Sequence, residues 1–84
     1  MQNVFITFRT VTPAQRGEGV LRKAGVPCTL SRTPGWMEEK GCGYCLRMRQ
    51  EFGARAVKQL REAQVSFRKV YLQHEDGNVE ELAL

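Results

Sequence analysis

Two cysteines stand three positions apart in the segment 42–45, and a thiolate is the strongest nucleophile that this sequence offers. Glycines on both sides of Cys42 let the backbone turn freely and leave the sulfur uncovered. Lys40 and Arg47 are near in sequence, and cationic neighbours lower a thiol pKa from about 8.5. We therefore expect Cys42 to be the reactive residue of the chain.

A Cys-x-x-Cys pair has three common uses. In redox proteins the first thiol attacks a disulfide and the second resolves the mixed species. In metal sites such a pair holds zinc or an iron–sulfur cluster together with other ligands. In sulfur relay the first thiol carries a persulfide, and a nearby second thiol releases it. For Cys45 a simple buried side chain is an equally good interpretation.

Metal binding and thioredoxin-like chemistry fit the pattern less well. A Cys₃His site would need Cys28, Cys42, Cys45 and His74, whose spacing matches no zinc-finger pattern. A thioredoxin-like motif should begin a helix, whereas residues 42–45 lead into a strand-like alternation. We expect no metal and no cofactor.

Size and composition limit the classes of protein in which this chemistry could occur. The 84 residues predict a single domain, with a core at about 4–72 and an acidic tail at 74–84 that is loose or docked. Three cysteines are an odd number, which does not describe a disulfide scaffold. We expect no secretory signal, and no apolar run approaches the roughly 20 residues that cross a bilayer. We expect a cytoplasmic protein, whose net charge of +4 suits an anionic partner or simply a solvated surface.

The hydrophobic pattern predicts six elements in the order strand, helix, strand, strand, helix, strand. The first helix should begin with a Thr12-x-x-Gln15 capping box and end at Gly25. Residues 32–43 read as a loop. The predicted strands are Val4–Phe8, Val26–Ser31, Tyr44–Arg49 and Val65–Leu72, and the second helix is Glu51–Ala63.

This order is typical of the α+β, ferredoxin-like split βαβ arrangement (βαββαβ), in which two helices cover one face of a four-stranded antiparallel sheet. If Leu46 and Met48 point toward the helices, alternation places Cys45, Arg47 and Arg49 on the open face. Cys28 is expected in the core.

Several of these residues resemble a known family. The apolar first strand, Lys23-Ala24-Gly25-Val26-Pro27, Arg32-Thr33-Pro34, and above all Gly41-Cys42-Gly43 followed by Leu46-Arg47-Met48 are similar to the small selenium/sulfur carrier-like family, over about residues 4–72. The resemblance implies that Cys42 bears sulfur or selenium and that Arg47 is the basic position of the following strand. Cys45 falls where members usually have a small or apolar residue.

These observations lead to a carrier or relay hypothesis rather than a conventional enzyme. Cys42 would carry a persulfide or selenenylsulfide, stabilised by Lys40, Gly41, Gly43 and Arg47, and Cys45 would be a resolving thiol. The partners would be sulfur or selenium donor and acceptor proteins. A thiol–disulfide redox protein using Cys42 and Cys45, and a non-catalytic module that binds a small molecule or a protein, are the alternatives. A homodimer is compatible with each; nucleic acid and membranes are not expected.

Overall fold

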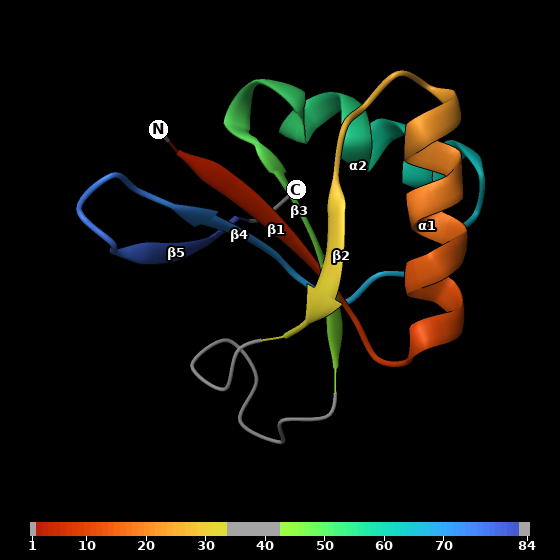
Figure 1. Cartoon of the computed structure of the whole chain (residues 1–84), viewed down its shortest axis with the longest axis horizontal. Helices are drawn as coiled ribbons and strands as arrows, with labels where there is room; N and C mark the ends of the chain where they lie inside the picture. The colour runs from red at the N-terminus through yellow and green to blue at the C-terminus, as the bar shows by residue number, and fades with distance from the viewer. Residues whose placement is uncertain (1, 34–42, 83–84) are drawn as a thin grey trace.

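The computed structural model describes residues 2–33 and 43–82 (Figure 1). This part of the chain is an α+β structure with two α-helices, one short 3₁₀ helix and one antiparallel sheet of five strands. In chain order the elements are β1 (Asn3–Phe8), α1 (Val11–Lys23), β2 (Thr29–Arg32), β3 (Tyr44–Arg49), the 3₁₀ helix η1 (Gln50–Phe52), α2 (Gly53–Glu62), β4 (Val70–Gln73) and β5 (Val79–Leu82).

The strands lie in the order β2-β3-β1-β4-β5, so β1 is at the centre of the sheet. Every neighbouring pair is antiparallel. The predicted strand β3 has the bounds that the alternation gave, and β1 and both helices are also confirmed within a few residues. None of the helices in residues 2–33 and 43–82 is long and apolar enough to cross a bilayer.

The prediction of four strands is wrong, because the acidic tail forms β5 and pairs with β4. A tight turn joins the two strands: the Gly77 N–H donates to the His74 carbonyl at 2.9 Å, and Gly77 has a φ of +92°. The Asp76 carboxylate accepts the Asn78 N–H at 3.0 Å. Asp-Gly is a strong hairpin signal, but the glutamates of 79–82 obscured the strand that follows it.

Both helices end in the same way, and this explains why β2 and β4 start later than predicted. After α1, Gly25 has a φ of +79°, and the Val26 N–H donates to the Leu21 carbonyl at 2.8 Å. After α2, Gln64 has a φ of +57°, and the Val65 N–H donates to the Leu60 carbonyl at 2.9 Å. Val26 and Val65 therefore close helices and bury their side chains instead of starting strands.

The start of α1 also differs from the expectation. The helix begins at Val11 with Thr10 as its N-cap residue, so the predicted capping box at Thr12 does not form. Thr10 makes no side-chain capping hydrogen bond. Pro13 lies within the first turn, where a helical N–H has no intrahelical partner to lose.

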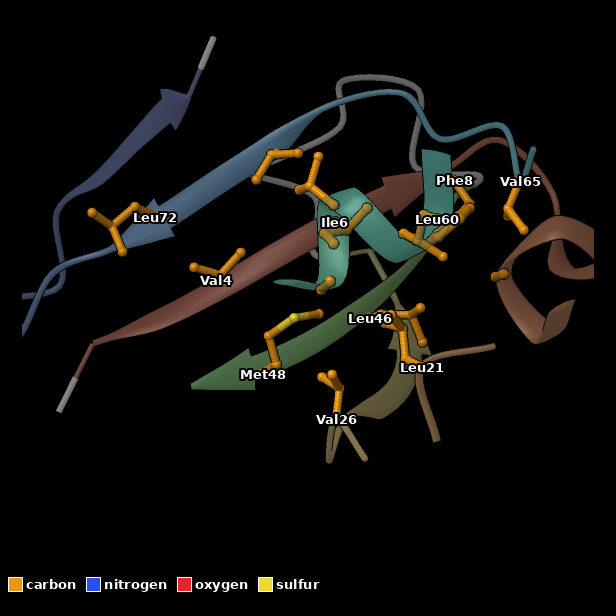
Figure 2. Packing of buried hydrophobic residues seen from close by; sticks show 14 residues of the cluster. Val4, Ile6, Phe8, Leu21, Val26, Leu46, Met48, Leu60, Val65 and Leu72 are labelled. Carbon is orange, nitrogen blue, oxygen red and sulfur yellow. The ribbon is translucent and has the colours of Figure 1, made fainter. Parts of the chain in front are cut away.

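One core lies between the sheet and both helices, as predicted. Figure 2 shows side chains from β1, β3 and α2 directed into it. Leu46 and Met48 belong to this core, whereas Arg47 and Arg49 on the opposite side of β3 are exposed. The buried members from the strands are Val4, Ile6, Phe8, Leu46, Met48, Val70 and Leu72, and those from the helices are Ala14, Leu21, Ala56, Val57 and Leu60.

Candidate functional site

The expected centre of the site falls partly outside the described residues. Lys40, Gly41 and Cys42 belong to the segment 34–42, so their predicted roles stay predictions. The structure does describe the residues on both sides of that segment, Thr33 directly after β2 and Gly43 directly before β3. The site is built from these two residues and from the strands that carry them.

Gly43 is held in a position where a larger side chain would be crowded. The Thr33 N–H donates to the Gly43 carbonyl at 2.9 Å, which continues the pairing of β2 with β3. A Cβ at position 43 would lie 3.0 Å from the Phe8 carbonyl oxygen and 3.1 Å from Thr33 Oγ1. Because one of these atoms belongs to the backbone of the central strand, it cannot move aside cheaply. Packing at this position therefore favours glycine after Cys42.

Cys45 points away from the helices, as predicted, but it is not accessible. Its side chain is 0% exposed, in register with Thr7 on β1 and Ser31 on β2. The Ser31 hydroxyl lies 3.5 Å from Cys45 Sγ, and the Arg32 carbonyl lies 4.0 Å from the same sulfur.

Burial raises the pKa of the Cys45 thiol, because the charged thiolate is poorly solvated there. The Ser31 hydroxyl, the charge of Arg47 and the Thr33 hydroxyl each lower this pKa, but they do not outweigh burial. The resting thiol is therefore protonated at neutral pH. A resolving role for Cys45 would require its sulfur to become exposed first.

The expectation of an uncovered second sheet face is wrong at this point. Phe5 and Cys45 form a second, smaller cluster of buried side chains, with Tyr71 partly buried against it. Phe5 stands opposite Arg47 on one side and Tyr71 on the other, and it is 8% exposed. Hydrophobic alternation alone did not show this, because Phe5 is the one apolar side chain of β1 on this face, where it lies between Asn3 and Thr7.

Thr33 is a candidate residue to which the sequence pattern assigned no role. Its side chain is 6% exposed, and its hydroxyl makes no well-formed hydrogen bond within residues 2–33 and 43–82. The hydroxyl nevertheless lies close enough to Cys45 to favour the thiolate. By contrast, the buried Thr7 hydroxyl is satisfied by the Lys69 backbone, at 3.3 Å to the carbonyl and 3.1 Å to the N–H. A buried hydroxyl without a well-formed hydrogen bond is costly, which makes Thr33 a candidate residue of the site.

Two arginines of the site occupy different places. Arg47 is exposed in the middle of β3, opposite Phe5, and its charge acts on Cys45. Arg32 lies at the end of β2, where its guanidinium stacks over the Tyr44 ring at 5.9 Å from the ring centre. Arg32 is paired with Tyr44, which follows Gly43 directly, so this cation lies beside the strand ends that flank the segment carrying Cys42. The sequence predicts a different charge partner for Cys42, namely Arg47 in β3, and this stays a prediction.

Cys28 and His74, the other described residues of the candidate metal site, contact other parts of the structure and not Cys45. Cys28 is half-buried and packs against the main core, as expected, and burial followed by the charge of Glu18 raises the pKa of its thiol. His74 Nδ1 lies 3.1 Å from Gln2 Nε2, and its Nε2 lies 3.3 Å from a Glu80 carboxylate oxygen. In the described part of the chain, no group of three histidine, cysteine or acidic side chains could hold a metal ion.

Comparison with known proteins assigns the family. A family model described as "Putative Se/S carrier protein-like" matches residues 3–72, which is most of the chain. No curated protein and no solved structure gives a significant match. The matched range includes β1 to β4, both helices, and the segment between Thr33 and Gly43. The chain belongs to this Se/S carrier-like family.

Proposed function

We propose that the protein is a sulfur or selenium carrier in which Cys42 bears the cargo as a persulfide or a selenenylsulfide. We also propose that β1 to β4 and the two helices form a ferredoxin-like split βαβ unit, to which β5 adds an edge strand. The protein would work in the cytoplasm, between a donor protein and an acceptor protein. Membership of the Se/S carrier-like family supports this role.

The single observation that carries the proposal is the fit of Gly43 between Thr33 and the Phe8 carbonyl. This packing fixes the backbone immediately after Cys42 to the end of the sheet. A cargo thiol must be presented to two different partners, which favours a cysteine anchored beside a rigid strand. It also explains in physical terms why glycine follows the cysteine.

Anion stabilisation is the second part of the proposal. A persulfide or a selenenylsulfide is anionic when it reacts, so it needs hydrogen-bond donors and positive charge nearby. The unsatisfied Thr33 hydroxyl and the Arg32 guanidinium lie at the strand ends that flank the cysteine segment. Lys40, Gly41 and Gly43 would also stabilise this anion, and Arg47 would contribute at longer range.

Loading would be a transfer between thiols without net oxidation. The Cys42 thiolate attacks the outer sulfur of a donor persulfide, the donor's S–S bond breaks, and the donor thiolate leaves with the electron pair. An acceptor thiolate would remove the cargo by the same reaction. With selenium, the outer atom is selenium and the same bonds form and break.

Cys45 would offer a second way to release the cargo. Its thiolate would attack Cys42 Sγ, expel hydrosulfide or hydroselenide and leave a Cys42–Cys45 disulfide, which a cellular dithiol reductant would reduce. The burial of Cys45 and the raised pKa of its thiol make this route slower than direct transfer to an acceptor. A thiol–disulfide redox protein is the alternative function, and it needs the same exposure of Cys45.

The test is intact-mass measurement after incubation with glutathione persulfide, with peptide mapping of the product. The wild type should gain one sulfur atom on Cys42, Cys42→Ser should gain none, and Cys45→Ser should load normally. Cys28→Ser is the matched control for the loss of one thiol. Normal loading of Cys42→Ser would overturn the carrier role, and loss of two hydrogens without added sulfur would support the redox alternative.

A further inference from the structure

One flank of α2, next to its buried face, carries a shallow hollow whose lining is partly apolar and partly basic. Ala54, Val57, Lys58 and Arg61 line it, with a volume of about 280 Å³. Their spacing of three or four residues places them along one stripe of the helix. The volume is slightly below the range of about 300–1,000 Å³ that is usual for small-molecule sites, so it suits one or two side chains.

The charges around this hollow have one predominant sign. Within α2, Arg55, Lys58 and Arg61 are exposed cations, and Glu62 is the single acidic residue. The acidic residues of the C-terminal part lie elsewhere, in the β4–β5 hairpin, whose tip projects from the side of the sheet away from α1 (Figure 1). That hairpin segment, residues 74–82, contains Glu75, Asp76, Glu80 and Glu81 and no lysine or arginine.

We infer that the stripe Ala54–Arg61 of α2 is a docking site for an acidic segment of a partner protein, with one apolar side chain of that segment seated between Lys58 and Val57. The apolar floor supplies a place to bury the anchor, and the cations complement the acidic residues that flank it. The inference goes beyond the carrier chemistry, because none of these residues belongs to the strand ends that flank Cys42.

Two other classes of partner fit less well. Binding to single-stranded nucleic acid depends on aromatic side chains that stack on bases, and α2 has none. Binding to a membrane surface needs large apolar side chains on the exposed face, and the large ones of α2, Val57 and Leu60, are 4% and 0% exposed. In addition, the apolar lining of the hollow would not bind the phosphate groups that nucleic acids and lipid headgroups carry.

The experiment is a titration of the isotope-labelled full chain, followed by amide chemical shifts. The probe is a synthetic peptide in which one leucine is flanked by glutamates, and its matched control has glycine in place of leucine. We expect shifts along residues 54–61, with binding of the control peptide about tenfold weaker. Equal binding of both peptides, shifts elsewhere, or no shifts on α2 at millimolar peptide would overturn the inference.

Charge-reversal variants make the test specific. Lys58→Glu should weaken binding of the acidic peptide about tenfold, and a peptide with lysines in place of glutamates should then bind this variant better than it binds the wild type. Lys23→Glu at the end of α1 makes the same charge change away from the hollow and should have little effect. Tighter binding of an RNA oligonucleotide or of anionic vesicles at α2 would contradict the proposed partner class. Tighter peptide binding after removal of residues 83–84 would assign the hollow to the chain's own end and would also contradict it.

Discussion

The Ser31 hydroxyl lies 3.5 Å from the Cys45 sulfur, across a directly paired position of β2 and β3. The contact gives the buried thiol a polar neighbour, but one hydroxyl does not replace the water that a thiolate would lose. Cys45 is therefore stable as a neutral thiol, and its ionisation is linked to the stability of the fold.

That linkage predicts a loss of stability at alkaline pH. The pKa of Cys45 in the folded state lies above its ordinary value, so the folded state holds the proton more tightly than the unfolded state. The contribution is complete below about pH 9 and is lost as the pH rises toward the folded pKa. Cys28 acts in the same direction.

The measurement is urea unfolding of the wild type and Cys45→Ala from neutral pH to about pH 10. Cys45→Ala should be less stable at neutral pH by about 1 kcal/mol, since it leaves a small void, but its stability should fall less steeply above pH 9. Equal slopes for the two proteins would show that Cys45 ionises as easily in the folded state as in the unfolded chain.

Two glycines of α1 provide a matched pair. A Cβ at Gly17 would lie 3.1–3.3 Å from side-chain atoms of Phe8, Leu60 and Leu46, whereas one at Gly19 would have no neighbour within 4 Å. Both substitutions to alanine gain about 1 kcal/mol of helix propensity. Gly19→Ala should therefore raise the free energy of unfolding by about 0.5–1 kcal/mol, and Gly17→Ala should lower it because overpacking costs about 1–3 kcal/mol. Thermal unfolding of both variants checks this, and a gain for Gly17→Ala would show that the two helices can move apart.

Gly43→Ala should affect both stability and loading. The new methyl group would meet the Phe8 carbonyl at 3.0 Å, so we expect a loss of about 1–3 kcal/mol in the free energy of unfolding. Loading of Cys42 with sulfur should slow as well, because the backbone after the cysteine is displaced. Gly19→Ala is the control, with unchanged loading. Full stability in Gly43→Ala would mean that β2 and β3 separate readily at this end.

The variant Thr33→Val tests whether the Thr33 hydroxyl has a role in loading Cys42 or affects only the stability of the fold. The substitution keeps the shape but removes a buried hydroxyl that has no hydrogen-bond partner in the described residues, so stability should rise by about 1 kcal/mol. If this hydroxyl stabilises the cargo anion, the same variant should load Cys42 more slowly. Ser31→Ala, in the strand β2 that precedes Thr33, is the comparison. Faster loading together with higher stability would show that Thr33 does not serve the cargo.

Much of the fold followed from local signals in the sequence. Alternation in β3 placed Leu46 and Met48 in the core and Arg47 on the other face, because strand side chains alternate strictly. The left-handed Gly25 was predictable because glycine adopts that conformation without strain. Gln64 performs the same task after α2 without being glycine, so the late start of β4 carried no comparable signal.

The sequence predicted the face of β3 on which Cys45 lies, but it did not settle whether the Cys45 side chain is buried. The side of β3 that Cys45 faces follows from alternation, but its burial depends on Phe5 and Ser31, which come from strands distant in sequence. Thr33 became a candidate only when its pairing with Gly43 was known. Register between strands is a property of the assembled sheet, and one sequence without its pairing partners does not specify it.

The added strand β5 changes what happens when two copies of the chain meet. It occupies the backbone groups of β4, which would otherwise form an open sheet edge able to pair with another molecule. The new edge carries Glu80 and Glu81, so a second copy approaching along it would place like charges side by side. We therefore expect the acidic tail to protect the protein against edge-to-edge aggregation, and we expect a chain shortened before residue 74 to lose solubility before it loses its core.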